Sequence, residues 1–322
     1  MNCEWCPPKC STKFPPCFQK YPGVSSKTNP GNILGLHHLA NRLKPDFLDG
    51  IKLDYCHRLN PNKVLTANWR LSHNEPSGFR FGGIYTAHLR GDVMQTPTIH
   101  ADINPSNFST DIGIVYYPHP RLRIQAEMQR ADIEAPLETQ TCIELSTNSS
   151  TLTGILYNAR KESGRGTLSY LRAINDKLSL GGELLIEWTD PYSMMADIAL
   201  AARYRRHAYS VAATISRQGI DVSYWQRLHR KIQMATLWAW QRKTEKSLAT
   251  ICYQWNFEDS HVRGQFDSNL SVGFMYSRIS FSRVMPHLPL SMDLSLLINL
   301  LTNRFAFGLN FTLDPSGLQR GE

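Results

Sequence analysis

The sequence predicts an all-β fold, a closed transmembrane β-barrel of about 19 strands, with a short N-terminal helix inside or at the pore. First, apolar and polar residues alternate with a period of two from Asp49 to Leu313, in about 19 segments of roughly ten residues each. Second, aromatic residues occupy the apolar parity, many of them near segment ends. Third, no apolar run reaches the roughly 18 residues of a spanning helix.

Length, net charge and cysteine usage restrict the class of protein, its possible partners and its cellular compartment. The chain has 322 residues, 42% of them hydrophobic and 19% charged, which fits a folded protein. Its net charge of +8 suits nucleic acid, an anionic membrane surface or anionic solutes, although much of the excess precedes Asp49. No secretory leader is recognisable, and the seven cysteines form no disulfide framework, so a reducing compartment is expected.

Residues 1–30 are predicted to be a flexible Pro/Cys-rich arm, because prolines, lysines and serines cannot pack a core. The arm contains Cys3, Cys6, Cys10 and Cys17, but its one CxxC pair has no second pair and no histidine. No metal site is therefore expected.

Residues 31–48 are predicted to form an amphipathic helix and a linker. Asn32 is a candidate N-cap, apolar residues follow at helical spacing as far as Leu43, and Pro45 lies just beyond. Leu36, His37 and His38 fall in this helix, which either lines the pore with both histidines toward water or only caps the barrel.

Residues 49–313 are predicted to form the barrel, and residues 314–322 a C-terminal tail. From alternation alone, a soluble β-sandwich or propeller also fits, although no blade-length repeat occurs. The two faces favour the barrel, because charges avoid the aromatic-rich parity, as expected of a surface that faces lipid.

Short motifs in a fixed order resemble the channel-forming subunit of the translocase of the outer mitochondrial membrane (TOM complex), within the mitochondrial porin superfamily. They are NPG at 29–31, Leu36-His37, DGIKL at 49–53, GFRFGGIY at 78–85, LGGELL at 180–185, SYWQ at 223–226, FDSN at 266–269 and LPL at 288–290. The resemblance covers about residues 29–313.

The resemblance implies a 19-stranded barrel whose first and last strands pair in parallel, with the helix inside the pore. It also implies a location in the mitochondrial outer membrane and the passage of unfolded precursor proteins. Receptor subunits and small helical subunits would dock on the barrel wall, within an oligomeric complex.

The last predicted strand, RFAFGLNFTL, resembles the sorting signal of mitochondrial barrels. Gly308, Phe311 and Leu313 fit that signal. Ala306 stands where the signal has a polar residue, and the tail continues past the usual end, which puts efficient assembly in question. A divergent, non-translocating scaffold paralogue is therefore one alternative.

The polar parity identifies a candidate acidic track in the lumen. Its twelve acids are Asp54, Asp102, Asp111, Glu127, Glu138, Glu144, Glu183, Glu187, Asp197, Asp221, Asp267 and Asp293. Ten bases share this parity, namely Lys52, Arg58, Arg70, Arg80, Arg123, Arg203, Arg205, Arg227, Arg263 and Arg304. The lumen is thus predicted to be mixed in charge and slightly acidic, which suits weak, exchangeable contacts with basic presequences.

Other bases fall in predicted turns, where they can meet lipid headgroups. No hydrolase, zinc-protease or phosphate-loop motif is present, so neither an enzyme nor a cofactor is expected, and nucleic acid is not an expected partner. Two alternatives to a protein-conducting pore stay open: an anion or metabolite channel resembling the voltage-dependent anion channel, and a soluble β-rich binding protein.

Overall fold

The computed structural model describes residues 29–60, 62–73, 77–87, 97–119, 121–132, 134–158, 163–190, 193–281 and 289–313. The predicted arm up to residue 28, with its four cysteines, and the predicted tail at 314–322 lie outside these residues.

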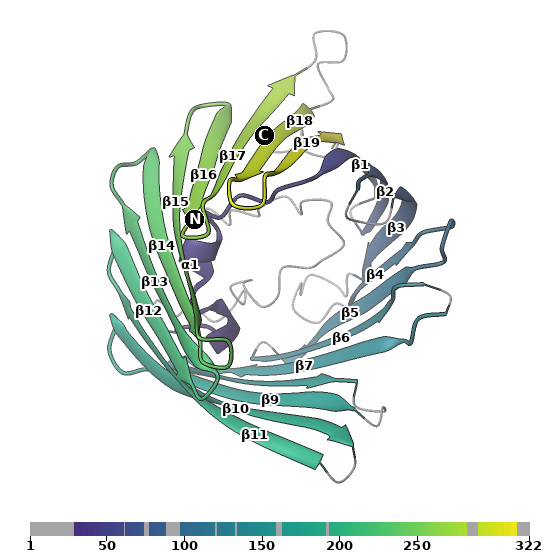
Figure 1. Cartoon of the computed structure of the whole chain (residues 1–322). Helices are drawn as coiled ribbons and strands as arrows, with labels where there is room; N and C mark the ends of the chain where they lie inside the picture. Colours follow the sequence, from purple (N-terminus) through teal and green to yellow (C-terminus); the bar gives the residue numbers. More distant parts are fainter. Residues whose placement is uncertain are drawn as a thin grey trace.

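The described residues form a 19-stranded sheet with a short helical segment inside it (Figure 1). The first ten strands are β1 (Gly50–Asn60), β2 (Lys63–Leu71), β3 (Gly78–Thr86), β4 (Thr98–Ile103), β5 (Thr110–His119), β6 (Leu122–Arg130), β7 (Glu138–Ser146), β8 (Ser150–Tyr157), β9 (Gly164–Ala173) and β10 (Leu178–Asp190). The others are β11 (Ser193–Arg205), β12 (Tyr209–Ser216), β13 (Gly219–Arg227), β14 (Ile232–Gln241), β15 (Lys246–Asn256), β16 (Ser260–Asp267), β17 (Ser271–Phe281), β18 (Pro289–Asn299) and β19 (Arg304–Leu313).

The sheet closes on itself through β1 and β19. Consecutive strands pair antiparallel, whereas β1 and β19 pair in parallel, with Gly50 opposite Gly308 and Tyr55 opposite Leu313. An odd number of strands forces this one parallel pair, because the first and last strands then run in the same direction. The predicted barrel, its strand number and its parallel closure are confirmed.

The sheet has an inner and an outer face because side chains alternate along each strand. Leu171, Ala201 and Ala212 contact the helical segment inside the barrel, so they mark the inner face. Cross-strand partners share a face, and the register therefore assigns every strand residue to one side. Large apolar side chains such as Phe79, Leu168 and Ile251 stay exposed on the outer face, as expected of a wall in contact with lipid.

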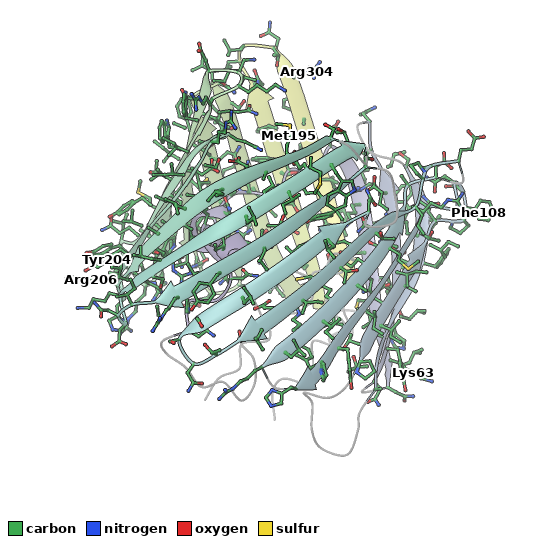
Figure 2. The ribbon with its side chains drawn as sticks, turned by 90° about the horizontal axis from the view of Figure 1, so that it is seen from below. Lys63, Phe108, Met195, Tyr204, Arg206 and Arg304 are labelled. Atoms are coloured by element: carbon green, nitrogen blue, oxygen red, sulfur yellow. The ribbon has the colours of Figure 1, made fainter. Side chains whose placement is uncertain are left out.

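The two rims are distinguished by the strand ends. Odd-numbered strands finish at the rim that also holds Asn29, which we call the near rim, and even-numbered strands finish at the far rim. Figure 2 labels Lys63, Tyr204 and Arg206 at the near rim, with Met195 and Arg304 at the opposite end.

Residues 29–48, the inner segment, cross the lumen as two short helical pieces. A 3-10 helix, η1, spans Ile33–Gly35, and α1 spans His38–Asn41. Asn32 caps η1 by accepting a hydrogen bond from the Gly35 amide at 2.9 Å, as predicted. The continuous helix predicted up to Leu43 is wrong, because the chain turns at His37, whose side chain bonds to the barrel wall. In the part of the chain described here, no helix is long and apolar enough to cross a membrane.

Candidate functional site: the lumen of the barrel

The inner segment is fixed to the near rim at its first residue. The Asn29 side chain donates to the Thr147 carbonyl oxygen at 2.7 Å and accepts from the Thr151 hydroxyl at 2.9 Å. The guanidinium of Arg203 donates to the Pro30 carbonyl oxygen at 2.5 Å. Hydrogen bonds from two separate parts of the wall therefore set where the segment enters the lumen.

Two apolar clusters hold the segment against the wall. Ile33 and Leu36 pack on Leu171, Ala201 and Ala212, and Leu36 is 3% exposed. Further along, Ala40 and Leu43 pack on Trp225, Ala235 and Cys252. The alanines leave room for the segment to approach the sheet, and Figure 1 shows α1 lying along this side of the barrel.

Between these clusters, His37 bonds to the wall through both ring nitrogens. Its Nδ1 lies 2.7 Å from the Ser223 hydroxyl and its Nε2 3.0 Å from the Thr214 hydroxyl. Burial lowers the pKa of His37 below its ordinary value, and the nearby Asp221 carboxylate opposes this shift. The pKa of His38 is also lowered, by burial first and then by Arg42. His37 faces the wall rather than the water, contrary to the prediction.

The segment leaves the lumen at the β1–β19 seam. The Ser295 hydroxyl bonds to both the amide and the carbonyl of Leu48, each at 3.2 Å. A Cβ at Gly308 would lie 2.2 Å from the Leu48 carbonyl oxygen, and a Cβ at Gly273 would lie 2.0 Å from the Phe47 ring. Both positions need glycine because the chain passes directly over them. Phe311 and Leu313 lie on the outer face.

We call the inner face of β9–β15 the covered wall, since the inner segment contacts strands within it. The inner face of β2–β7 is the open wall, and it carries charge. Asp102 and Asp111 lie directly opposite each other on β4 and β5. Arg80 lies 3.4 Å from the Asp102 carboxylate, and His100 lies 3.7 Å from the Asp111 carboxylate.

The charged network of the open wall continues through β6 and β7. Arg123 lies 3.8 Å from the Glu144 carboxylate and donates to Gln125 at 2.5 Å. Gln125 in turn donates to the Glu127 carboxylate, and Gln129 donates to Asp111 at 3.4 Å. Acidic, amide and basic groups therefore follow one another across neighbouring strands.

The register places all twelve predicted acids on the inner face. Asp54 pairs with Lys52 at 2.6 Å, Glu187 with Arg165 at 3.6 Å, and Asp293 accepts from Asn310 at 3.1 Å. The remaining acids share the inner parity on β7, β10, β11, β13 and β16, namely Glu138, Glu183, Asp197, Asp221 and Asp267. Glu183 and Asp197 lie on the neighbouring strands β10 and β11, but no contact within the set assembles all twelve into one site.

The register also adds two bases that parity counting missed. Arg165 pairs with Glu187 on the inner face of β9 and β10, and Lys246 pairs with Gln241 on the inner face of β14 and β15. On the strands that the structure describes, these two and the ten predicted bases make twelve, against twelve acids on the same inner face. Both bases fall at the first or second position of a strand, where the alternating pattern is hardest to read.

The wall residues that hold the inner segment were also missed. Ser223, Thr214 and the small residues at 201, 212 and 235 were assigned no role. A sequence signal exists, because the inner parity of β12 and of β14 carries no charged residue, whereas β4, β5 and β6 each carry at least one.

Among the described residues, no group of His, Cys, Asp or Glu is arranged to hold a metal ion. A closed barrel with an apolar outer face and a charged lumen is the architecture of a membrane channel.

The comparisons with known proteins identify the family. Residues 29–308 match the family model described as eukaryotic porin, so the chain belongs to the eukaryotic porin family. The chain is 24% identical over 310 residues to a Caenorhabditis briggsae protein named mitochondrial import receptor subunit TOM40 homolog, covering 92% of this chain and 99% of that protein. It is 25% identical over 296 residues to human mitochondrial import receptor subunit TOM40B, covering 88% of this chain and 92% of that protein.

A solved structure is also similar, a mutant porin from Rh. blastica with a TM-score of 0.45 and 12% identity, covering 71% of this chain and 94% of that one. Family and relatives make this chain a β-barrel protein of the mitochondrial outer membrane, a porin and a channel that serves protein transport. Family members are channels, which fits the expectation that the chain is not an enzyme.

Proposed function

We propose that this barrel conducts unfolded precursor proteins with basic presequences across the mitochondrial outer membrane. The relatives named as import receptor subunits support an import channel. The mixed charge of the lumen supports the passage of unfolded precursors in particular, because an unfolded chain needs a series of weak contacts rather than one tight binding site.

The observation that supports this proposal most directly is the arrangement of charged groups on the open wall. Its carboxylates Asp102, Asp111, Glu127 and Glu144 stand among amide and basic groups on four neighbouring strands. Each contact with a passing lysine or arginine would contribute a few tenths to about 1 kcal/mol, which is weak enough for release. The inner segment packs on the covered wall, so we place the passing chain along the open wall.

Partners follow from the same proposal. Precursor proteins would pass through the lumen, while receptor subunits and small helical subunits of the translocase would dock on the outer wall within an oligomeric complex. Membrane lipids would surround the rest of the apolar outer face.

A planar bilayer experiment tests the proposal. The refolded barrel is expected to conduct ions, and a basic presequence peptide added to one side is expected to block the current in a voltage-dependent manner. Anion preference with no response to the peptide would instead support the anion or metabolite channel, which the net charge of +8 favours.

A barrel that conducts ions but does not import precursor proteins would support the alternative of a divergent, non-translocating scaffold paralogue. The membrane location speaks against the soluble β-rich binding protein. Carbonate extraction checks this, because an integral barrel stays with the membrane pellet.

A further inference from the structure

A cluster of basic and aromatic side chains lies on the outside of the near rim, away from the lumen and its proposed transport. We call it the rim cluster, and its members are Arg172, Lys177, Tyr204, Arg206 and Tyr209 from β9–β12 and their turns. Figure 2 shows Tyr204 and Arg206 together at this end of the barrel.

Arg206 is held in place by two tyrosines. Its Nε donates to the Tyr204 hydroxyl at 2.9 Å. Its guanidinium carbon lies 5.8 Å from the centre of the Tyr204 ring and 5.9 Å from that of Tyr209. The guanidinium is therefore oriented by cation–π contacts and a hydrogen bond before any ligand arrives, although the residue is exposed.

The register fixes which way this cluster faces. Tyr204 pairs with Leu178 and Val211, and its neighbour Arg203 reaches into the lumen to bond with Pro30. Because successive side chains of a strand point to opposite faces, Tyr204 points outward. Tyrosines at the end of an outward apolar face mark the level of lipid headgroups, so Arg206 stands at that level.

Two further bases flank the oriented guanidinium. The Lys177 carbonyl oxygen accepts from the Arg205 amide at 2.7 Å, which places the two turns side by side, and Lys177 interacts electrostatically with Tyr204. Arg172 pairs with Leu180 and is exposed on the same outer face. Asp176 is the acid of this turn, so the rim cluster keeps a positive charge.

We propose that the rim cluster binds the headgroup of an anionic membrane phospholipid. The terminal N–H groups of Arg206 would bind the phosphodiester oxygens, since a planar guanidinium matches phosphate geometry. Lys177 and Arg172 would attract the extra negative charge of the headgroup, and the tyrosine rings would pack on the glycerol and upper acyl chains. An acidic peptide fits less well, because the rings face the lipid side of the wall.

Lipid retention by the refolded full-length barrel in detergent tests this proposal. Phosphatidylinositol and phosphatidylcholine are titrated separately, and the bound lipid is counted by native mass spectrometry. The wild type is expected to bind phosphatidylinositol at least tenfold more tightly than phosphatidylcholine. Arg206→Gln is expected to reduce that preference about tenfold.

Two matched variants sharpen the result. Arg242→Gln removes an exposed arginine from the β14–β15 turn at the far rim and is expected to change nothing. Arg206→Lys keeps the positive charge but removes the planar guanidinium that the tyrosines orient. The affinity for phosphatidylinositol is therefore expected to fall several-fold. Strand content by circular dichroism confirms that each variant is folded.

Three outcomes would overturn the proposal: equal losses for Arg206→Gln and Arg242→Gln, full binding by Arg206→Lys, or displacement of the lipid by inorganic phosphate or an acidic peptide at matching concentration. The measurement involves no presequence, so its failure would leave the proposed transport function untouched.

Discussion

The covered wall and the open wall are built by the same alternation of side chains, yet their inner faces differ in chemistry. On the covered wall, Ala201, Ala212 and Ala235 are small and buried beneath the inner segment. On the open wall, the corresponding inner positions carry Asp102, Asp111 and other charged groups. The same alternation therefore gives an apolar docking surface on one side of the lumen and a network of charged and amide groups on the other.

This difference shows how a barrel can keep a segment in its lumen without blocking it. Apolar contacts bind the inner segment to one side, where Ala201, Ala212 and Ala235 line the wall beneath it. The charged side offers no comparable gain, since its carboxylates already pair with Arg80, His100 and Arg123, and an apolar segment cannot replace those partners. Each prediction below tests one side against the other.

The largest effect is expected from placing a charge beneath the inner segment. Leu36→Asp would bury a carboxylate against Leu171 and Ala212, so docking should weaken by about 3 kcal/mol or more. The segment should then become open to trypsin after Arg42 while the barrel keeps its strands. Limited proteolysis with circular dichroism measures both.

Leu34→Asp is the matched control for that experiment. Leu34 lies in the same helical piece but is 47% exposed, so its replacement should leave proteolysis unchanged. If both variants are equally resistant to trypsin, the apolar clusters do not hold the segment.

A smaller effect is expected from neutralising the open wall. Asp102→Asn combined with Asp111→Asn removes two opposing carboxylates from β4 and β5. The preference for cations over anions and the affinity for a presequence peptide should each fall two- to threefold, the change that roughly 0.5 kcal/mol makes. Reversal potentials in a salt gradient, with peptide titration, provide the measurement.

Glu187→Gln is the control on the covered side. Glu187 pairs with Arg165 at 3.6 Å and is about half exposed (45%), so water already screens its charge. An equal loss in this variant would show that the lumen acts through its total charge and not through the open wall.

The smallest effect is expected from pH. The docked His37 has a lowered pKa because it is buried, whereas a released His37 has its ordinary value near 6.5. The released state therefore binds more protons, so docking is strongest above about pH 6.5 and weakens as pH falls toward the docked pKa. The loss is at most about 1.4 kcal/mol per pH unit from this residue.

Anisotropy of a dye attached at Leu34→Cys, with the native cysteines replaced, would follow this release between pH 7.5 and 5. His37→Gln cannot titrate, so its curve should be flatter. His38 adds a shift of the same sign, because burial and Arg42 also lower its pKa. A wild-type curve without any change across this range would contradict the pH dependence.

The sequence by itself determined the barrel, its closure and the two faces of its wall. Alternation with a period of two is a local property, so strands such as Leu122–Arg130 and Arg304–Leu313 could be read directly from their residues. Counting them gave an odd number, and the family resemblance supplied the parallel closure. The parity of each acid followed from the same local rule.

Only the tertiary structure decided which wall the inner segment covers and where its helix breaks. His37 turns toward Ser223 and Thr214, which lie more than 170 positions away in the chain, and Leu48 is held by Ser295 and passes over Gly308. Such contacts depend on how the closed barrel brings distant strands around the segment. Local periodicity carries no information about them, because it describes which face a residue occupies and not what stands opposite that face.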